Sequence, residues 1–565
     1  MKLRRLQISN FRGIRELELF LDDLVVLIGE NNSGKTAILD ALRLCLRDLS
    51  SRRRVVFNPF DFHLVDENAT PTSTNPIQII FTFSEDAEGE WDSTLVGRLN
   101  RQKILQIDDE GKGHVVLAVT CTYDAATRDF AQNWDFHTLD NQPLPGVADS
   151  ALTTLQREVV YFYLSALRDA SKHFDAKGPF WRPFLRDSEL SDEKKEEIEQ
   201  KLKEVNDLVI ASHTSFEEAC NRLRSVQDVV PMASGDVVSI EAVPGRMFDM
   251  LAKAQVFLAT STGAKVPIER HGEGTQSLAV LTLFKAFLDT WPNGFPIIGL
   301  EEPEAHLHPS AIRSLWKIVS DFPGQKIIST HSGDLLSEIP ASAIRRLCRT
   351  QEGTRISSLK SSTLTPDDER KFNFHVRYAR GELLFARCWL LVEGETEVTL
   401  LPEVARYLGI NLENAGVRCV PHRHASIELF LKVARDLGIA CCVLADNDDQ
   451  GAKDQECAHR YLEPKMINHT LHVMSESDIE CHLCSAGFGQ VYESYLSPQT
   501  WSRVMASRNE PEYWPQVLTA IKKSKSFAKP EAALRVVDLI HNETISVPPL
   551  LESVVKASVN LSGGL

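Results

Sequence analysis

The segment from Gly29 to Thr36 reads GENNSGKT and fits the phosphate-binding motif G-x-x-x-x-G-K-[ST] at each fixed position. In such a loop, backbone N–H groups and the start of a helix face phosphate oxygens. Lys35 is placed to reach the β- and γ-phosphates, and the Thr36 hydroxyl to hold Mg²⁺. The sequence therefore predicts a nucleoside triphosphate site formed by Gly29, Asn32, Gly34, Lys35 and Thr36.

Further along the chain, a pair of acids is suited to hydrolysing a bound nucleotide. Residues 295–300 (FPIIGL) are apolar and lead into Glu301 and Glu302. At the end of a strand beside the γ-phosphate, one carboxylate binds Mg²⁺ and a second activates water. We assign Glu301 to the metal and Glu302 to the water. Another strand-like run, residues 325–330 (QKIIST), ends in His331, which can contact the γ-phosphate.

The C-terminal part carries a second group of acids. Residues 389–392 (WLLV) precede Glu393, residues 440–445 (ACCVLA) precede Asp446, and a third acidic segment, SESDIE, ends in Glu480. Acids at adjacent ends of parallel strands converge, and such a cluster is costly unless divalent cations neutralise it. Two metal ions there would suit phosphodiester cleavage. The alternative, solvated acids in turns, would explain any one of these segments taken alone.

The segments around these residues predict the strands and helices that position them. Residues 24–28 (LVVLI) are typical of a buried strand and residues 37–42 (AILDAL) of a helix start. This context argues against a chance match in a glycine-rich turn. Strands alternating with helices return after about residue 231 and again in the C-terminal part. The pattern predicts an α/β fold with sites at the carboxyl ends of parallel strands.

The composition divides the chain into four segments, which are 1–185, 186–230, 231–365 and 380–550. The second segment differs from the others, because it is rich in Glu and Lys and carries apolar residues three and four positions apart. This spacing predicts amphipathic helices. Two interpretations of them stay open: a helical insertion used for dimerisation, and an ordinary surface hairpin of helices.

Charge and composition narrow the class of protein. The net charge of −16 over 565 residues argues against broad, non-specific wrapping of nucleic acid, but it allows a local basic groove or contact through bridging metal ions. No run of about 18 apolar residues is present, so we expect no membrane span. The eleven cysteines are scattered in a long chain without an export signal, which favours reduced thiols and a cytoplasmic protein.

The first 365 residues resemble the ABC-type ATPase fold of the chromosome-maintenance and recombination ATPases. The resemblance rests on residues 29–36, 300–309 (LEEPEAHLHP) and 329–332 (STHS). In that family a signature loop of one protomer closes over the ATP of another, which implies a homodimer or higher oligomer. The matching loop here is 271–277 (HGEGTQS), which departs from the usual Ser-Gly-Gly order. Its glycines before a predicted helix still suit a γ-phosphate contact.

Glu393 with Gly394, followed by Asp446 and Asp448, resembles the Toprim domain of topoisomerases, primases and some nucleases. An ABC-type ATPase fused to a Toprim domain resembles the overcoming-lysogenization-defect (OLD) family of nucleases and the related nuclease subunit of the Gabija antiphage system. The resemblance implies a two-metal site whose ligands are Glu393, Glu397, Asp446, Asp448, Asp478 and Glu480. It also implies a lysine that stabilises phosphate charge, for which we prefer Lys529 and place Lys525 second.

Together these features predict an ATP-binding, Mg²⁺- or Mn²⁺-dependent DNA endonuclease that nicks or cleaves DNA in antiphage defence. The predicted catalytic residues are Glu302, His331, Glu393, Asp446 and Lys529. An alternative is an ATPase clamp or sensor on DNA in recombination or repair, whose Toprim-like domain only recruits partners. Acids at three strand ends favour the nuclease, because a scaffold does not need them. Two questions stay open: whether a helicase-like subunit acts beside the chain, and whether ATP activates or restrains cleavage.

Overall fold

The computed structural model describes two compact units of the chain. The residues that it describes are 1–50, 55–66, 68–124, 129–165, 192–212, 257–259, 265–289, 291, 294–350, 353–360, 362–379, 381–423, 425–522 and 527–563. The first unit comprises Met1–Tyr163, Gly294–Glu302 and Gly324–Leu565, and the second comprises Leu164–Asn293 and Pro303–Pro323. Within the described part of the chain, no helix is both long enough and apolar enough to cross a membrane.

In the first unit, a six-stranded sheet carries the phosphate-binding loop at the end of an interior strand. Its spatial order is β14 (Gly353–Ser358), β13 (Ile344–Thr350), β3 (Leu24–Gly29), β12 (Gln325–Ser329), β11 (Phe295–Glu301) and β8 (Val159–Leu164). β3 runs parallel to β12 and β13, and β12 runs parallel to β11, so these strands end at one edge. The strand predicted at 24–28 is confirmed as β3, and the helix predicted at 37–42 as α1 (Lys35–Leu42).

An antiparallel sheet shares the hydrophobic core of β3 and α1. It contains β2 (Ile14–Phe20), β1 (Lys2–Phe11), β4 (Ile77–Ser84), β6 (Gly113–Asp124) and β5 (Gln106–Ile107) in that order, with β7 (Asp129–His137) also paired to β6. Along β1, Leu6 and Ile8 are fully buried on alternate positions, which is the strand period expected for one covered face. Helices α2 (Ser93–Arg101), α3 (Ala151–Glu158) and α11 (Gly333–Leu336) belong to the same unit.

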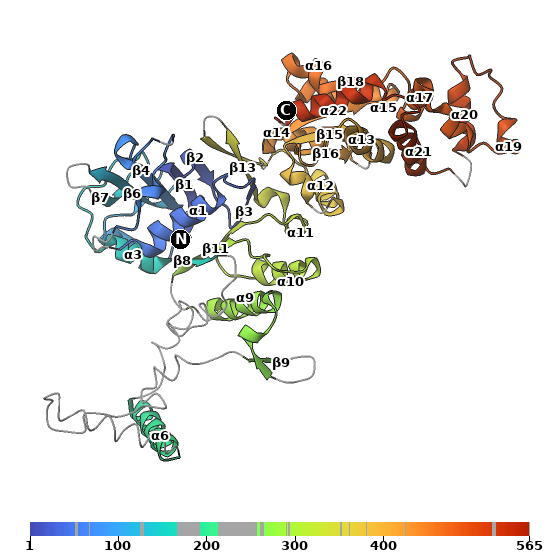
Figure 1. Ribbon diagram of the computed structural model, residues 1–565. Coiled ribbons are helices and arrows are strands. Elements are labelled where there is room, and N and C mark those ends of the chain that lie inside the picture. Colours follow the sequence, from blue (N-terminus) through green and yellow to red (C-terminus); the bar gives the residue numbers. More distant parts are fainter. Residues whose placement is uncertain are drawn as a thin grey trace. The chain divides into compact units, whose positions relative to one another are not determined.

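The C-terminal part of this unit is built on a four-stranded parallel sheet (Figure 1). Its order is β16 (Val417–Pro421), β15 (Cys388–Val392), β17 (Ala440–Ala445) and β18 (Leu471–Val473). The strands predicted at 389–392 and 440–445 are confirmed as β15 and β17. The helices of this part are α13 (Glu395–Tyr407), α14 (Ile427–Leu437), α15 (Asp449–Tyr461), α16 (Ile467–Thr470), α17 (Ile479–Leu483), α18 (Gly489–Glu493), α19 (Pro498–Trp501), α20 (Tyr513–Ile521), α21 (Lys529–His541) and α22 (Pro549–Leu561).

Helix α12 (Pro366–Tyr378) precedes this sheet and packs onto it. The Thr365 side chain caps its first turn, which satisfies a backbone N–H that has no partner within the helix. Phe372 is fully buried, and its ring lies 6.5 Å from that of Trp389 on β15 and 6.4 Å from that of Phe430 on α14. These aromatic contacts fix the position of α12 relative to β15.

The second unit contains α6 (Asp192–Ala211), β9 (Phe257–Ala259), β10 (Lys265–Pro267), α9 (Glu273–Asp289) and α10 (Pro309–Ser320). Helix α9 packs on α10. The structure has a helix, α6, within the predicted helical segment 186–230, whereas residues 186–191 and 213–230 lie outside the described part of the chain. On α6, the side chains of Val205 and Leu208 are 48% and 68% exposed.

Candidate functional site

Glycine is required at both ends of the phosphate-binding loop. Gly29 has a φ of +148°, and a Cβ there would lie 2.3 Å from the main-chain oxygen of Leu347. Gly34 has a φ of +105°, and helix α1 begins at the next residue, Lys35. Asn32 also adopts a left-handed backbone conformation, with a φ of 61°. The loop can therefore turn sharply from β3 into α1, which places a helix N-terminus at the cavity.

The Lys35 side chain is held within this loop. Its Nζ donates hydrogen bonds to the main-chain oxygens of Gly29 at 2.7 Å and Glu30 at 2.8 Å. Burial lowers the pKa of Lys35 to about 8, although the neighbouring carboxylates of Glu302, Glu30 and Glu301 act in the opposite direction. A phosphate bound at this nitrogen would add negative charge and raise the pKa again.

Glu301 is brought directly against the loop. The Thr36 hydroxyl donates to Glu301 Oε1 at 2.6 Å, so two groups that were predicted to share one Mg²⁺ ion are in contact. The phenol of Tyr163 donates to Glu301 Oε2 at 2.5 Å. Burial and this bond raise the pKa of Tyr163, so the phenol stays a hydrogen-bond donor. Each carboxylate oxygen of Glu301 therefore accepts a hydrogen bond that orients it, one from Thr36 and one from Tyr163.

Glu302 and His331 lie beside each other at the ends of β11 and β12. His331 Nε2 is 3.9 Å from Glu302 Oε1. Glu302 has a φ of 45°, which is uncommon for a residue with a side chain, and its N–H donates to Ser329 O at 2.9 Å. Burial and the charge of Lys35 lower the pKa of His331, which favours a neutral imidazole.

Most of these residues line one cavity of about 560 Å³, whereas Gly29, Glu301 and Tyr163 are not among its lining residues. Its lining includes most of the predicted ATP-site residues and two arginines, as follows: Arg12, Gly13, Asn31, Asn32, Ser33, Gly34, Lys35, Thr36, Ala37, Glu302, Ser329, His331 and Arg349. The buried Ser33 Oγ has no hydrogen-bond partner among the described residues. Glycines, a lysine and backbone amides around such a cavity suit a triphosphate.

The predicted signature loop, residues 271–277, forms the entry to helix α9 in the second unit. Glu273 begins this helix, and its Oε2 lies 3.1 Å from His306 Nδ1. A Cβ at Gly274 would lie 3.2 Å from His306 O, so the loop packs closely on the turn before α10. The closure of this loop over the nucleotide of another protomer stays a prediction.

The C-terminal acids follow the parallel strands as the sequence predicted. β15 and β17 are adjacent and parallel, so Glu393 and Asp446, which follow their last residues, lie at the same edge. Asp448 caps α15 by accepting hydrogen bonds from the N–H groups of Gln450 at 3.0 Å and Gly451 at 2.7 Å. The strand–turn–helix geometry thus gathers these side chains at the sheet edge that binds ligands in open α/β folds.

Two of the acids at this edge, Asp446 and Glu397, have raised pKa values. Burial raises the pKa of Asp446, and so do its hydrogen bond to Glu393 and the charges of nearby carboxylates. Burial also raises the pKa of Glu397 to about 7, with smaller contributions from Glu480 and Glu393. Like charges held together in a poorly solvated place must be neutralised, either by protons or by cations.

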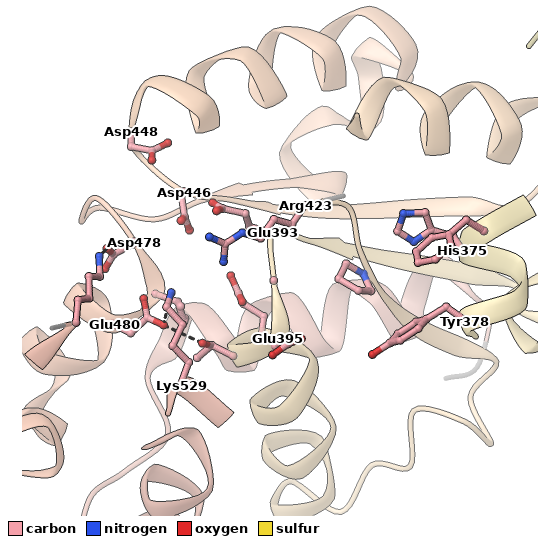
Figure 2. Close-up of a pocket in the computed structure, with 17 residues that line it drawn as sticks. His375, Tyr378, Glu393, Glu395, Arg423, Asp446, Asp448, Asp478, Glu480 and Lys529 are labelled. Carbon is pink, nitrogen blue, oxygen red and sulfur yellow. Dashed lines mark hydrogen bonds and ion pairs between the residues drawn. The ribbon is translucent and has the colours of Figure 1, made fainter. Parts of the chain in front are cut away.

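Lys529 places a cation directly against these acids. Its Nζ lies 2.9 Å from Glu480 Oε1, which also accepts a hydrogen bond from the Thr396 hydroxyl at 2.8 Å (Figure 2). Although burial acts to lower it, the charge of Glu480 and neighbouring acids raises the pKa of Lys529. The second candidate, Lys525, lies outside the described residues, and Lys522 is 3.9 Å from Asp478 Oδ2.

All of these groups line a second cavity, of about 640 Å³. Figure 2 shows Asp446 and Glu393 facing it beside Asp478, Glu480 and Lys529. The full lining is Phe374, His375, Tyr378, Glu393, Gly394, Glu395, Thr396, Glu397, Pro421, Arg423, Asp446, Asp448, Asp478, Ile479, Glu480, Lys522 and Lys529. The cavity therefore contains every predicted metal ligand of the C-terminal part.

The donor set of this cavity fits hard divalent cations. Asp446 Oδ1 and Glu480 Oε2 are buried, and neither has a hydrogen-bond partner among the described residues. Among the residues that the structure describes, no three His, Cys, Asp or Glu side chains are placed close enough to bind one metal ion together. Mg²⁺ commonly binds through one or two carboxylates and keeps several waters or phosphate oxygens. Carboxylates spaced along one wall can provide such partial coordination.

Residues 1–382 match the family model described as "Protein of unknown function (DUF2813)". The chain belongs to the DUF2813 family. Residues 384–448 of this DUF2813 protein match the model "Overcoming lysogenization defect protein-like, TOPRIM domain". The predicted recognition as an OLD-type chain is confirmed, and so is the α/β fold class with a Toprim parallel sheet in the C-terminal part.

Several relatives align with this DUF2813 chain over most of their length. "Uncharacterized protein YbjD" from Escherichia coli (strain K12) is 27% identical and is matched over 87% of this chain and 88% of its own. "OLD nuclease" from Thermus scotoductus is 25% identical, over 79% of this chain and 82% of its own. "Endonuclease GajA" from Bacillus cereus (strain VD045) is 23% identical, over 85% of this chain and 80% of its own.

Some site residues of the DUF2813 chain were not found from the sequence. Tyr163 reaches Glu301 only because β8 joins the sheet beside β11, and no local pattern signals that pairing. Thr396 stands inside the segment EGETE, where the flanking acids drew attention instead. The three side chains contributed by α12 were also missed, because they lie before the Toprim segment and follow no acidic motif.

Proposed function

We propose that this DUF2813 protein is an ATP-binding, divalent-metal-dependent DNA endonuclease that nicks or cleaves DNA and acts in antiphage defence. The observation that carries the proposal is the cavity in which buried, unpartnered carboxylate oxygens face Lys529 within an OLD-like Toprim domain. Relatives named OLD nuclease and endonuclease GajA, which align over most of the chain, support the same reaction class.

In this proposal the carboxylates bind the divalent cations, and Lys529 binds the substrate phosphate. Mg²⁺ or Mn²⁺ bound by these carboxylates would supply an activated water and stabilise the leaving oxygen. Lys529 would hold the charge of the scissile phosphate, because its ammonium faces the same cavity as the acids. Thr396 and Lys529 together orient Glu480. The proposed ligands are Glu393, Glu397, Asp446, Asp448, Asp478 and Glu480.

The ATP site has its own division of roles. Thr36 and Glu301 would bind the Mg²⁺ ion of the nucleotide, with Tyr163 orienting Glu301. Glu302 would take the proton of the attacking water, and the neutral His331 would contact the γ-phosphate. The remaining contacts would come from Gly29, Asn32, Gly34 and Lys35.

An oligomer is part of the proposal. The loop 271–277 would close over the nucleotide of a second copy, and the exposed Val205 and Leu208 of α6 offer apolar surface for such an assembly. The expected state is a homodimer or a higher homo-oligomer on DNA, and a helicase-like subunit could join it. Light scattering with ATP present measures this directly, and a monomer with normal ATP hydrolysis would contradict it.

The nuclease assignment is tested by cleavage of supercoiled and linear DNA with Mg²⁺ or Mn²⁺. Asp446→Ala removes a metal ligand, so cleavage should fall to the level of the parent protein in EDTA. ATP hydrolysis should survive in this variant, because the ATP ligands lie on other strands. Asp449→Ala is the matched control. Asp449 is the neighbour of Asp448 but does not itself line the cavity, so cleavage should persist in this variant.

The clamp or sensor hypothesis makes the opposite forecast for the same proteins. It expects the parent protein to bind DNA and hydrolyse ATP, with any cleavage equal in the parent and in Asp446→Ala. Such equal cleavage would come from a contaminant or from another site, and the nuclease proposal would be wrong.

A further inference from the structure

The cavity at the Toprim sheet edge has two chemically different ends. One end carries the acids and Lys529. The other is formed by α12, which contributes Phe374, His375 and Tyr378, and these three residues are called here the aromatic end. Figure 2 shows His375 and Tyr378 on the opposite side of the pocket from Asp478 and Glu480. Metal-dependent chemistry at the acidic end gives no reason for aromatic rings at the other.

Two of the aromatic rings are held in the open by the way α12 packs. Phe374 and Tyr378 are four residues apart, so they lie on one face of the helix as neighbours. Phe372 and Val376, on the other face, are buried in the Toprim core. The result is that the Phe374 and Tyr378 side chains are 59% and 74% exposed although the helix itself is firmly anchored.

A pair of exposed rings on an anchored helix, both lining a cavity, is suited to stacking. The His375 ring sits behind them, with its centroid 5.7 Å from that of Phe374 in an edge-to-face arrangement and 5.1 Å from that of Phe430. Phe430 is fully buried, so His375 is fixed from below. Because the helix that carries the rings is already anchored, a flat ligand does not have to order the backbone beneath them when it stacks.

We propose that the aromatic end binds an unpaired base of the DNA whose scissile phosphate lies at the acidic end. The substrate class is therefore DNA that is single-stranded or locally unpaired at the cleavage site. This inference rests on the proposed nuclease function and specifies its substrate. The cavity volume of about 640 Å³ falls within the range of roughly 300–1,000 Å³ that is typical of small-ligand sites, which a nucleotide suits.

The requirement for an unpaired base follows from geometry. A base within a duplex is stacked on both faces, so its ring surface is not available to a protein side chain. Rings that line a cavity of this size can stack on a base next to the scissile phosphate only after that base has left the helix. Arg423 also lines the cavity, and its main-chain N–H donates to the main-chain oxygen of Glu393 at 3.1 Å, so the chain brings a cationic side chain close to the acids for the connecting phosphate.

The test measures DNA binding separately from cleavage. All proteins carry Asp446→Ala, and Kd is measured by fluorescence anisotropy for a labelled oligothymidylate and for a labelled blunt duplex. Changing both rings, Phe374→Ala with Tyr378→Ala, should weaken oligothymidylate binding by about 5- to 150-fold, as expected for losing stacked bases. Duplex binding should change by less than about twofold, because phosphate contacts are retained.

Three further proteins make the result specific. Tyr378→Phe keeps the ring and should bind oligothymidylate like the parent, whereas Tyr378→Leu keeps apolar surface without a ring and should bind weakly. Trp501→Ala removes an exposed aromatic side chain that lies outside the cavity, and it should change nothing. Melting temperatures should match the parent throughout, since the changed rings are exposed.

The outcomes separate this inference from the nuclease assignment. Equal weakening of single-stranded and duplex binding, or no weakening, would overturn the aromatic end as a base site. A change of oligomeric state in the double variant would also overturn it, because the rings would then cover another copy of the chain. If the parent protein cleaves no DNA with any metal while oligothymidylate binding still needs both rings, the base site stands and the nuclease assignment fails.

Discussion

Lys35 is both a buried cation and the main positively charged side chain of the phosphate-binding loop. Its two carbonyl partners satisfy its hydrogen bonds but carry no full charge, so burial dominates and its pKa is lowered to about 8. Below this pH, Lys35 of the free protein is already protonated and can bind a phosphate as a cation. Above this pH, Lys35 must take up a proton when ATP binds, so the affinity for ATP depends on pH.

We expect ATP affinity to be constant below about pH 8 and to fall above it, by about tenfold for each pH unit until the pKa of the bound state is reached. Isothermal titration of the parent protein with ATP at pH 7, 8 and 9 measures the effect. Lys35→Ala should bind weakly at all three values, with the pH dependence lost. An affinity of the parent that is flat between pH 7 and 9 would show that Lys35 is not the coupled group.

The acids of the Toprim cavity make the corresponding forecast for metal ions. Glu397, with a pKa of about 7, and Asp446, with a raised pKa, hold protons near neutral pH, and a divalent cation must displace them. We expect Mn²⁺ binding at pH 7 to release about one proton and to weaken as pH falls. Calorimetry in two buffers with different ionisation enthalpies counts the protons.

Glu397→Gln is the control for this proton release. It keeps the shape of the side chain and removes one titrating group, so the number of released protons should fall. Release that is unchanged in this variant, or a metal affinity that does not vary from pH 6 to pH 8, would contradict the link between metal binding and these carboxylates.

At the scale of elements, the Toprim strands and the acids at their ends could be predicted largely from the order of apolar runs and acids in the sequence. β15 and β17 could be recognised because each is a short apolar run followed by an acid, and parallel pairing then brings Glu393 and Asp446 together. Glu480 could be singled out as the end of an acidic segment, but its role as a metal ligand needed the family resemblance. The aromatic end could not be foreseen, because the packing of α12 on β15 depends on ring contacts between residues distant in sequence.

The junction of β17 and α15 is a close contact that fixes Asp446. A Cβ on Gly451 would lie 1.9 Å from the main-chain oxygen of Asp446. Gly451→Ala should therefore push the end of β17 away, destabilise the protein by about 1–3 kcal/mol and abolish DNA cleavage while ATP hydrolysis continues. Cleavage and ATPase assays, with a melting curve, measure the three effects.

Gly97→Ala serves as the control for this substitution, because a Cβ there meets no atom within 4 Å and the residue lies inside α2. This variant should be as stable as the parent or slightly more so, since alanine favours helix. Normal cleavage by Gly451→Ala would mean that the close approach does not position Asp446.

At the scale of the whole molecule, the buried side chain of Arg346 joins the sheet of the phosphate-binding loop to the Toprim part. Arg346 on β13 donates to the main-chain oxygens of Ala386 at 2.9 Å, Gly438 at 3.0 Å and Leu437 at 3.2 Å. The same strand pairs with β3, whose end begins the phosphate-binding loop. One path from the loop to the Toprim backbone therefore runs through this strand and this side chain.

Arg346→Met should loosen this connection without removing either site. Three carbonyl groups lose a charged donor, and each such bond contributes about 1.5–3 kcal/mol, so the two parts should unfold in separate transitions. Differential scanning calorimetry should show one main transition for the first unit in the parent and two in the variant. The effect of ATP on DNA cleavage, whichever its sign, should shrink toward none.

Arg345→Met is the matched control, because Arg345 is equally buried but bonds to Ser342 O and Asp22 within the ATPase part. It should lower the stability of the ATPase part and leave the ATP effect on cleavage in place. If both variants behave alike, Arg346 contributes general stability and does not couple the two sites.

The central place of β3 also has a consequence for how the protein is made. The two strands that pair with β3, β12 and β13, lie between residues 325 and 350, whereas β3 ends at Gly29. At about 5–20 residues per second, roughly 300 residues of translation separate them, which takes about 15–60 s. During this interval the nascent chain exposes an apolar strand with both edges open, so its synthesis depends on shielding from other emerging chains.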